Sequence, residues 1–313
     1  MCVTCGCGEG ETTIQRVGDV HSHGDGDLSA HTHADGTTHS HGHDHGGHDH
    51  GHAHPHEHPH DHDHDQAHAH AHDHALNHGH DHAHDLQVPG RSSETIALET
   101  AILGKNQALA ERNRGWLAGR GVLALNLMSS PGAGKTTLLE RSIRDLQGQV
   151  AISVVEGDQA TTHDAQRIRA TGAAAVQVNT GTGCHLEADM LARALELLQP
   201  ARGSLLVIEN VGNLVCPALF DLGERARVVI FSVTEGEDKP LKYPHMFSTA
   251  DVLLLSKTDL LPHLRVDLRL MMDNALAVNS RLKIFPISAY TGAGLDAWYG
   301  WLRGELASGA AHV

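Results

Sequence analysis

A histidine-rich tract near the N-terminus divides the sequence sharply. Residues 21 to 84 hold 25 of the chain's 30 histidines, most of them alternating with Asp, Ala or Gly, as in His41-Gly42-His43-Asp44-His45. A segment with almost no large apolar side chains cannot build a packed core. We therefore expect residues 11–92 to form a long disordered tail and the ordered fold to occupy residues 93–313.

The tract also indicates a chemistry, because neutral imidazole is a good ligand for nickel, copper and zinc. A solvating acidic tail is the alternative, but Ser or Glu would solvate equally well without binding metal. We take the following histidines of the tract as candidate metal ligands: His41, His43, His45, His48 and His50.

Charge is concentrated in the same region. Residues 1–90 contain 15 acidic residues and one basic residue, whereas residues 91–313 contain 23 acids and 22 bases, so the net charge of −15 is the sum of −14 and −1. A nearly neutral ordered part argues against nucleic-acid binding. No run approaches the roughly 20 apolar residues of a membrane span, and a signal-peptide core is absent. We expect a cytoplasmic chain without a membrane partner.

Residues 93–313 alternate between strand and helix patterns. Short apolar runs predict strands at Val122–Met128, Val150–Val155, Ala174–Val178, Leu205–Ile208, Val228–Val233, Val252–Ser256 and Lys283–Ile287. Helical patterns cover Glu94–Leu117 (with Ser93 as N-cap), Thr136–Leu146, Glu187–Leu198 and Val266–Ala277. This alternation predicts an α/β fold with a largely parallel, doubly wound sheet.

The first predicted strand runs directly into Ser129-Ser130-Pro131-Gly132-Ala133-Gly134-Lys135-Thr136-Thr137, and an amphipathic helix follows. This is a P-loop in the strand–loop–helix context that the motif requires. Backbone N–H groups surround the phosphates, Lys135 reaches the β- and γ-phosphates, and Thr136 ligates Mg²⁺. Ser129 stands where the motif usually has its first glycine. The candidate nucleotide-binding residues here are Gly132, Ala133, Gly134, Lys135, Thr136 and Thr137.

A second motif indicates which base is bound. Ser256-Lys257-Thr258-Asp259 resembles the Asn-Lys-x-Asp guanine motif, with Ser256 in place of Asn. The carboxylate of Asp259 accepts hydrogen bonds from two guanine N–H groups that adenine lacks, and the stem of Lys257 lies along the purine face. Ser288-Ala289 matches the third guanine-contact segment. Their order and spacing behind the P-loop predict GTP and GDP as ligands.

Two acidic segments complete the predicted hydrolytic site. Glu156-Gly157-Asp158 ends the second strand, and Glu209-Asn210-Val211-Gly212 ends Leu205–Ile208. Carboxylates at strand ends hold the waters around Mg²⁺ or orient the attacking water. We therefore take Lys135, Asp158 and Glu209 as the candidate catalytic residues of a GTPase.

All five cysteines lie in positions that suit a metal. Cys2, Cys5 and Cys7 place three thiolates within six residues at the N-terminus. With the α-amine or a tail histidine as fourth donor they suit Ni²⁺, and Zn²⁺ would take the same donors tetrahedrally, so the metal stays open.

The other two cysteines belong to the nucleotide domain. Cys184-His185 follows a glycine-rich segment and is predicted to begin a helix, while Cys216 lies seven residues after Glu209. Cys216 is thus on the element expected to respond to the γ-phosphate. A metal held by Cys184, His185 and Cys216 would be linked to the nucleotide state, because switch loops rearrange on hydrolysis.

Together these motifs resemble the HypB-type hydrogenase nickel-incorporation GTPases of the SIMIBI class of P-loop proteins. The resemblance rests on Cys2/Cys5/Cys7, the histidine tract, Ser129–Thr137, Glu156–Asp158, Cys184-His185, Glu209–Pro217 and Lys239–Pro244. It implies a GTP-dependent homodimer with a metal site at the interface, built from the Cys184, His185 and Cys216 of both subunits. It also implies nickel delivery to the hydrogenase large subunit, with a small zinc-containing accessory protein as partner.

The sequence thus predicts a nickel metallochaperone whose GTP hydrolysis gates nickel release during hydrogenase maturation, with residues 1–10 as a cysteine metal motif and the tail as a nickel store. Two alternatives stay open. One is a urease-type nickel GTPase, although the urease relatives carry Cys-Pro-His where this chain has Cys216-Pro217 without a following His. The other is a nickel-storage protein whose nucleotide domain serves dimerisation.

Overall fold

The structure, a computed structural model, describes residues 12–16, 31–32, 38–39, 93–159 and 163–310. Predictions about the cysteines Cys2, Cys5 and Cys7 and about the histidines from His41 to His50 lie outside the described residues. Contacts divide the chain into one unit of residues 1–20 with 90–313 and another of residues 21–89. In the second unit, strand β2 (His31–Thr32) pairs antiparallel with β3 (Thr38–His39).

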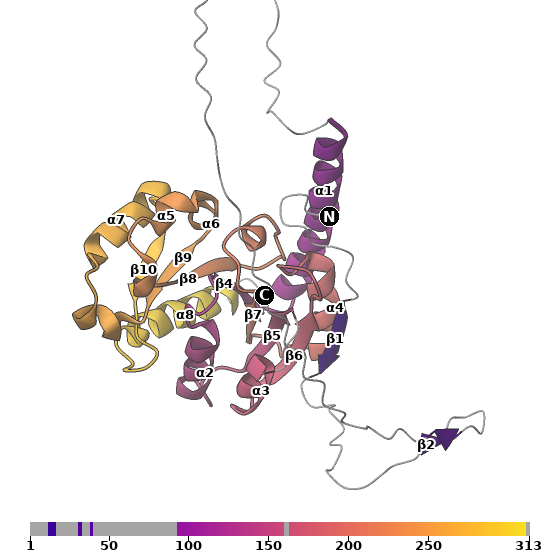
Figure 1. Ribbon diagram of the computed structural model, residues 1–313. Helices are drawn as coiled ribbons and strands as arrows, with labels where there is room; N and C mark the ends of the chain where they lie inside the picture. The colour runs from indigo at the N-terminus through magenta and orange to yellow at the C-terminus, as the bar shows by residue number, and fades with distance from the viewer. Residues whose placement is uncertain (1–11, 17–30, 33–37, 40–92, 160–162, 311–313) are drawn as a thin grey trace, which may run out of the picture. The chain divides into compact units, whose positions relative to one another are not determined.

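An eight-stranded sheet forms the centre of the larger unit (Figure 1). Its strands are β1 (Thr13–Arg16), β4 (Leu123–Ser129), β5 (Ile152–Asp158), β6 (Ala174–Asn179), β7 (Leu205–Glu209), β8 (Ala226–Ser232), β9 (Val252–Ser256) and β10 (Lys283–Pro286). They lie in the order β1-β6-β5-β7-β4-β8-β9-β10, and every pair is parallel except β1 with β6. The predicted doubly wound α/β fold is confirmed.

Helices cover both faces of this sheet (Figure 1). They are α1 (Ser93–Ala118), α2 (Lys135–Asp145), α3 (His163–Arg169), α4 (Ala188–Leu198), α5 (Lys239–Lys242), α6 (Pro244–Ser248), α7 (Leu268–Val278) and α8 (Leu295–Ala310). The described residues also contain three 3₁₀ turns, each of which follows a strand: η1 (Cys216–Ala218), η2 (Val233–Glu235) and η3 (Thr258–His263). Among the described residues, no helix combines the length and the apolar character needed to cross a membrane.

The core is built from alternate side chains of the strands. In β4, Leu123, Leu125 and Leu127 pack with α2, α3 and α8 on one face. Ala124 packs with α1 and α4 on the other face, where Met128 joins the cluster under α6 and α7. Because both faces are covered, the strands have nearly continuous apolar sequences, which is why they could be predicted.

Strand β1 lies inside the segment interpreted as a tail and was not predicted. It pairs with β6 from Thr13 opposite Asn179 onward. Ile14 packs against the core beneath α4, and the Arg16 guanidinium donates to the Leu197 carbonyl at 2.6 and 3.2 Å. Four residues with one apolar side chain carry too weak a pattern to predict a strand.

The predicted helix start at Cys184-His185 is wrong. Both residues lie in the turn before α4, which begins at Ala188. The residue before it, Glu187, has an extended backbone (φ −112°, ψ 160°) and occupies the N-cap position. The turn leaves both Cys184 and His185 outside the helix, where their side chains can approach another loop.

Candidate functional site

The carboxyl ends of the parallel strands gather the predicted site residues at one edge of the sheet. Strands β4, β5, β7 and β9 end at Ser129, Asp158, Glu209 and Ser256, respectively. In open α/β sheets, ligands bind in the crevice outside these ends. A cavity of about 500 Å³ lies there, lined by residues of the P-loop, the two acidic segments and Lys257.

The P-loop is held in shape by its own polar groups. Gly132 and Gly134 adopt positive φ values of 74° and 100°, which allow the loop to curl before α2 begins at Lys135. The Lys135 ammonium donates to the Ser129 hydroxyl at 2.9 Å. Ser129, at the position usually held by glycine, therefore supplies a polar partner for the phosphate-binding lysine. The hydroxyl of Ser130 donates to Glu235 of η2.

A buried pair of acids lies beside Thr136, the predicted magnesium ligand. Glu156 and Glu209 are opposite each other on β5 and β7 and are only 3% and 4% exposed. The Thr136 hydroxyl donates to Glu209 Oε1 at 2.7 Å. Burial, and next the charge of Glu209, raise the pKa of Glu156 to about 8. Burial likewise raises the pKa of Glu209 and lowers that of Lys135.

These groups fit a divalent cation. Among the described residues, neither Glu156 Oε2 nor Glu209 Oε2 has a hydrogen-bond partner, although both atoms are buried. Buried carboxylate oxygens and a threonine hydroxyl are the hard ligands that Mg²⁺ prefers, directly or through water. Asp158 lines the same cavity, as predicted. Glu156 was named in the sequence motif but not chosen as a site residue, because its burial cannot be read from a short loop pattern.

The predicted guanine-binding residues also converge. Ser288 is fully buried and donates its hydroxyl to Asp259 Oδ1 at 2.5 Å. Ser256 donates to the Ala133 carbonyl at 2.7 Å, and Lys257 donates to the Gly132 carbonyl at 2.7 Å. Ser256, which replaces the motif's asparagine, thus joins β9 to the P-loop.

One cavity residue had no sequence signal. Arg167 of α3 donates to Glu140 at 2.9 Å, to Asp164 at 3.1 Å and to the Thr137 hydroxyl at 3.3 Å. It lines the cavity with the P-loop residues although it lies 30 positions away from Thr137. No motif marks an isolated arginine, so only the fold reveals that the Arg167 guanidinium lies beside the P-loop.

The three metal donors predicted within the domain are brought together. Ligand atoms of Cys184, His185 and Cys216 all lie within 4.8 Å of one another. Cys216 is 2% exposed at the start of η1, and His185 is 6% exposed and stacks on Phe220 with ring centroids 4.0 Å apart. Cys184 Sγ lies 3.6 Å from His185 Nδ1. Two thiols and one imidazole suit Ni²⁺ or Zn²⁺.

Packing connects these metal donors to the nucleotide cavity. A Cβ on Gly157 would lie 2.8 Å from Leu186, so the glycine of the acidic segment leaves room for the residue after His185. Asn210, which follows Glu209, accepts hydrogen bonds from the backbone N–H of Leu186 at 3.1 Å and of Val211 at 3.0 Å. One buried asparagine therefore fixes both the turn that carries Cys184 and His185 and the loop after β7.

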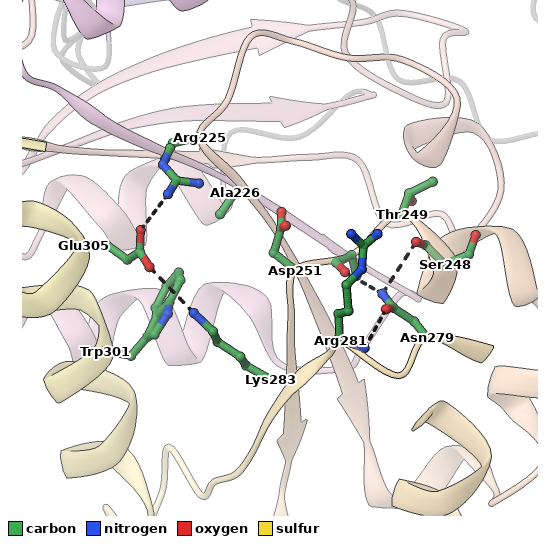
Figure 2. Close-up of a pocket in the computed structure, with 11 residues that line it drawn as sticks. Arg225, Ala226, Ser248, Thr249, Asp251, Asn279, Arg281, Lys283, Trp301 and Glu305 are labelled. Atoms are coloured by element: carbon green, nitrogen blue, oxygen red, sulfur yellow. Dashed lines mark hydrogen bonds and ion pairs between the residues drawn. The ribbon is translucent and has the colours of Figure 1, made fainter. Parts of the chain in front are cut away.

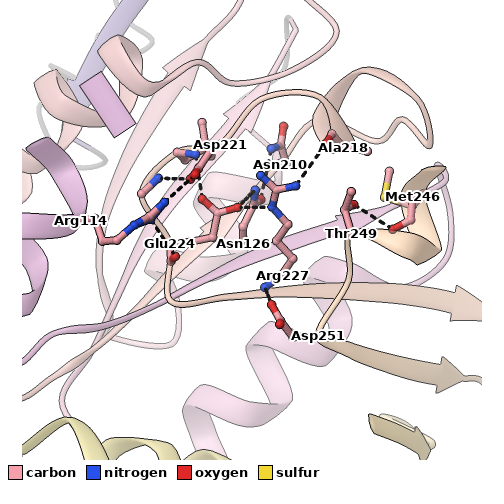
Figure 3. A network of polar contacts seen from close by, with 12 residues as sticks. Arg114, Asn126, Asn210, Ala218, Asp221, Glu224, Arg227, Met246, Thr249 and Asp251 are labelled. Atoms are coloured by element: carbon pink, nitrogen blue, oxygen red, sulfur yellow. Dashed lines mark hydrogen bonds and ion pairs between the residues drawn. The ribbon is translucent and has the colours of Figure 1, made fainter. Parts of the chain in front are cut away.

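A network of polar contacts extends from Asn210 to side chains of β4 and β8 (Figure 3). Asn210 donates to Asn126 Oδ1 at 3.2 Å, and Asn126 donates to Glu224 at 3.3 Å. Arg227 binds Glu224 at 2.8 Å and also donates to the Ala218 carbonyl at 3.2 Å. Because Ala218 ends η1, the network supports the turn that carries Cys216.

A second cavity, of about 260 Å³, lies at the opposite edge, where β8 and β10 begin (Figure 2). Its charged side chains come from the loops that lead into β8, β9 and β10, from the first residue of β10 and from α8. Glu305 binds Arg225 at 3.3 Å and Lys283 at 3.8 Å, and Lys283 also lies over the Trp301 ring. These contacts join α8 to the sheet, and none of the predicted site residues lines this cavity.

Comparison with known proteins agrees with this geometry. The family model described as CobW/HypB/UreG, nucleotide-binding domain, matches residues 123–286, which contain the P-loop, both acidic segments and the metal donors. The chain belongs to this family. Within it, the chain is of the HypB type: it is 58% identical over 219 residues to the hydrogenase maturation factor HypB of Rhizobium leguminosarum bv. viciae, covering 70% of this chain and 73% of that protein.

Other HypB proteins give the same result. The hydrogenase maturation factor HypB of Escherichia coli (strain K12) is 54% identical over 216 residues, which cover 69% of this chain and 74% of that protein. The crystal structure of HypB from Archaeoglobus fulgidus is 41% identical with a TM-score of 0.61, covering 65% of this chain and 99% of that one. HypB from Helicobacter pylori in complex with nickel is 37% identical with a TM-score of 0.62, covering 65% and 96%.

Proposed function

We propose that this chain is a GTP-hydrolysing metallochaperone that delivers nickel for hydrogenase maturation. The observation that carries the proposal is that the segment from Glu209 to Cys216 contacts both the P-loop and the candidate metal donors. Its first residue, Glu209, binds the Thr136 hydroxyl of the P-loop, and its eighth, Cys216, lies with the other two metal donors. Between them, a Cβ on Gly212 would lie 3.3 Å from Pro131 of the P-loop. A change at the γ-phosphate therefore moves a metal ligand.

The proposed reaction is in-line attack of water on the γ-phosphate of GTP. Lys135 places its charge beside the β- and γ-phosphates, and Asp158 and Glu209 orient water at that end of the cavity. Thr136 and the carboxylates would hold Mg²⁺, which would supply positive charge beside the phosphate oxygens. Asp259, fixed by Ser288, selects guanine. Intrinsic turnover is slow, since such GTPases depend on an added arginine or partner for speed.

Nickel is the cargo rather than a resident cofactor in this proposal. Cys184, His185 and Cys216 bind it in the domain, Cys2, Cys5 and Cys7 bind it at the N-terminus, and the histidine tract stores it. Zn²⁺ is the competing ion for the same donors. Val215 and Leu219 flank Cys216 and are 50% and 42% exposed, which supports a GTP-dependent homodimer with the metal site at its interface. The hydrogenase large subunit and a small zinc-containing accessory protein are the proposed partners.

Nucleotide selectivity tests the enzymatic part. The full chain is expected to hydrolyse GTP and not ATP with Mg²⁺ present. Asp259→Ala should remove this preference, because the mutant no longer pairs with the two guanine donors. Asp273→Ala, on the surface of α7, is the matched control. An Asp259→Ala variant that keeps full GTP preference would contradict the assignment of the base site.

Nickel delivery for urease maturation is the second candidate function, and one comparison favours it. A Helicobacter pylori relative described as a hydrogenase/urease maturation factor HypB is 44% identical over 177 residues, covering 55% of this chain and 72% of that protein. Deleting the gene in a host with both enzymes separates the two: loss of hydrogenase activity supports the main proposal. Loss of urease activity with normal hydrogenase activity would support the role in urease maturation instead.

A storage role predicts a different phenotype. Deletion of residues 21–84 should leave hydrogenase maturation intact in nickel-rich medium if the tail is only a reservoir. If maturation then fails despite ample nickel, the tail belongs to the delivery path.

A further inference from the structure

Among the described residues, two cations besides the P-loop lysine line the nucleotide cavity. One is Lys257, which belongs to the predicted base-binding segment and donates to the Gly132 carbonyl at 2.7 Å. The other is Arg167 of α3, which takes no part in the reaction proposed above. The Arg167 side chain is 33% exposed, so a ligand in the cavity can reach it. Arg167 is therefore a candidate ligand-binding residue to which no ligand has been assigned.

The packing of α3 determines where Arg167 lies. Ala165 and Ile168 are 1% and 0% exposed, and Ile168 packs in the same apolar cluster as Leu138 and Leu139 of α2. Figure 1 shows α3 beside α2. Successive residues of a helix are rotated by about 100°, so Arg167, one position before Ile168, is turned away from the core. It meets the first turns of α2 instead.

Three hydrogen bonds hold the Arg167 guanidinium against α2. It donates to Glu140 Oε2 at 2.9 Å and to the Thr137 hydroxyl at 3.3 Å, both on α2, and to Asp164 Oδ1 at 3.1 Å on its own helix. A guanidinium has more N–H groups than these contacts use, and its planar fork matches phosphate oxygens as well as carboxylates. The two acids therefore fix the position of the cation and leave N–H groups for an anionic ligand in the cavity.

The position of Thr137 indicates which phosphate the guanidinium meets. In a P-loop, backbone N–H groups surround the α- and β-phosphates, the lysine reaches the β- and γ-phosphates, and the next hydroxyl binds Mg²⁺. Here the last two are Lys135 and Thr136, and the Thr136 hydroxyl donates to Glu209 at 2.7 Å. Thr137 is one position further along α2, and its hydroxyl instead accepts from Arg167. Arg167 therefore lies on the α-phosphate side of the loop, away from the residues that serve Mg²⁺ and the γ-phosphate.

We propose that Arg167 binds the α-phosphate of the guanine nucleotide and sets the affinity of the site for GDP and GTP alike, an assignment that rests on the nucleotide binding proposed above. The α-phosphate is common to substrate and product, and the charge that changes during hydrolysis lies on the γ-phosphate and the leaving oxygen. A contact that is equally strong in the ground state and the transition state lowers KM without accelerating the chemical step. Arg167 is thus a binding residue and not the arginine that accelerates hydrolysis in some GTPases.

A contact with the α-phosphate persists through hydrolysis. Because GDP keeps this phosphate, Arg167 continues to hold the product after the γ-phosphate has left. The P-loop then stays occupied, and the two states of the site differ only at the γ-phosphate. Arg167 therefore restricts the nucleotide signal to the end of the cavity where Thr136 contacts Glu209.

A series of guanine ligands tests the assignment. Competition against a fluorescent GDP analogue gives Kd values of guanosine, GMP, GDP and GTP for the full chain and for Arg167→Gln. The variant should bind the three nucleotides about tenfold more weakly, the usual effect of losing a hydrogen bond to a charged group, and guanosine equally well. Arg169→Gln, at an exposed position of α3, is the matched control and should bind all four as the parent does. A loss confined to GTP, or a loss shared by guanosine, overturns the assignment to the α-phosphate.

Hydrolysis kinetics and a conservative variant complete the test. Under single-turnover conditions, Arg167→Gln should raise the concentration of protein sites needed for half-maximal GTP hydrolysis about tenfold and leave the maximal rate within about twofold of the parent. A maximal rate that falls tenfold would place the arginine at the γ-phosphate and overturn the inference. If Arg167→Gln does not fold, Arg167→Lys, which keeps the charge but loses the fork, should show the same ligand pattern with a smaller loss.

The two proposals fail in different ways. If the parent chain binds GDP and GTP no more tightly than guanosine, the proposed nucleotide function itself is wrong. If the parent binds them tightly and the Arg167 variants bind them equally well, only the role of Arg167 is overturned.

Discussion

Replacing Glu156 by glutamine is predicted to stabilise the protein relative to the parent, in the absence of nucleotide and metal, by an amount that grows as the pH rises. Glu156 is 3% exposed, its Oε2 has no hydrogen-bond partner among the described residues, and Glu209 lies opposite on the next strand. These conditions raise the pKa of Glu156 to about 8 from its ordinary value of 4.5. The folded state therefore holds a proton that the unfolded state has already lost between these two pH values.

The sign and size follow from proton linkage. Where the folded state binds one proton more, the free energy of unfolding falls by about 1.4 kcal/mol for each pH unit. The stabilisation associated with protonated Glu156 is fully present below pH 4.5 and is lost progressively up to about pH 8. At pH 7 the loss has reached about 3 kcal/mol. Glutamine keeps the shape of the protonated acid and does not titrate, so the variant escapes this loss.

Urea unfolding between pH 5 and 8.5 measures the effect in the presence of chelator. The difference in unfolding free energy between Glu156→Gln and the parent should be about 1 kcal/mol at pH 5 and grow to about 3 kcal/mol at pH 7. Glu196→Gln, which removes a carboxylate from the exposed side of α4, is the control and should follow the parent profile. A Glu156→Gln difference that stays constant across this range would refute the buried-acid account.

Three further predictions concern the supports of the two sites. Asn210→Ala removes acceptors from two buried N–H groups and should cost about 3 kcal/mol of stability in urea unfolding; a loss below about 0.5 kcal/mol would show that the metal-bearing turn does not depend on it. Gly157→Ala brings a Cβ to 2.8 Å from a leucine and should cost about 1–3 kcal/mol, again by unfolding, whereas a neutral result would mean that the leucine moves freely. Ser288→Ala releases Asp259 and should raise KM for GTP about tenfold with little change in kcat; an unchanged KM would assign Ser288 a packing role only.

The sequence predicted the sheet and the nucleotide motifs well, because both depend on local patterns. Strands covered on both faces have continuous apolar runs, and each one predicted within residues 93–313 is present with its ends shifted by no more than three residues. Fixed spacing placed Lys135, Thr136 and Asp259 correctly at the edge of the sheet. The short helix α3 and the C-terminal helix α8 were not predicted.

Contacts between distant segments could not be predicted in this way. Arg167 reaches the P-loop only because α3 folds back beside α2, and Asn210 supports the metal-bearing turn only because β7 ends next to it. The edge strand β1 depends on pairing with β6 rather than on its own four residues. The raised pKa of Glu156 likewise results from the register of β5 with β7.

Nickel affinity as a function of the bound nucleotide tests the central claim most directly. In a chain with Cys2, Cys5 and Cys7 replaced by serine and residues 21–84 deleted, the candidate nickel site that remains in the domain is Cys184, His185 and Cys216. Nickel titration of this variant with GDP and with a non-hydrolysable GTP analogue should give Kd values that differ at least about tenfold, or 1.4 kcal/mol, which is within the usual range of coupling between sites. Equal affinities with the two nucleotides would contradict gating of nickel by GTP hydrolysis.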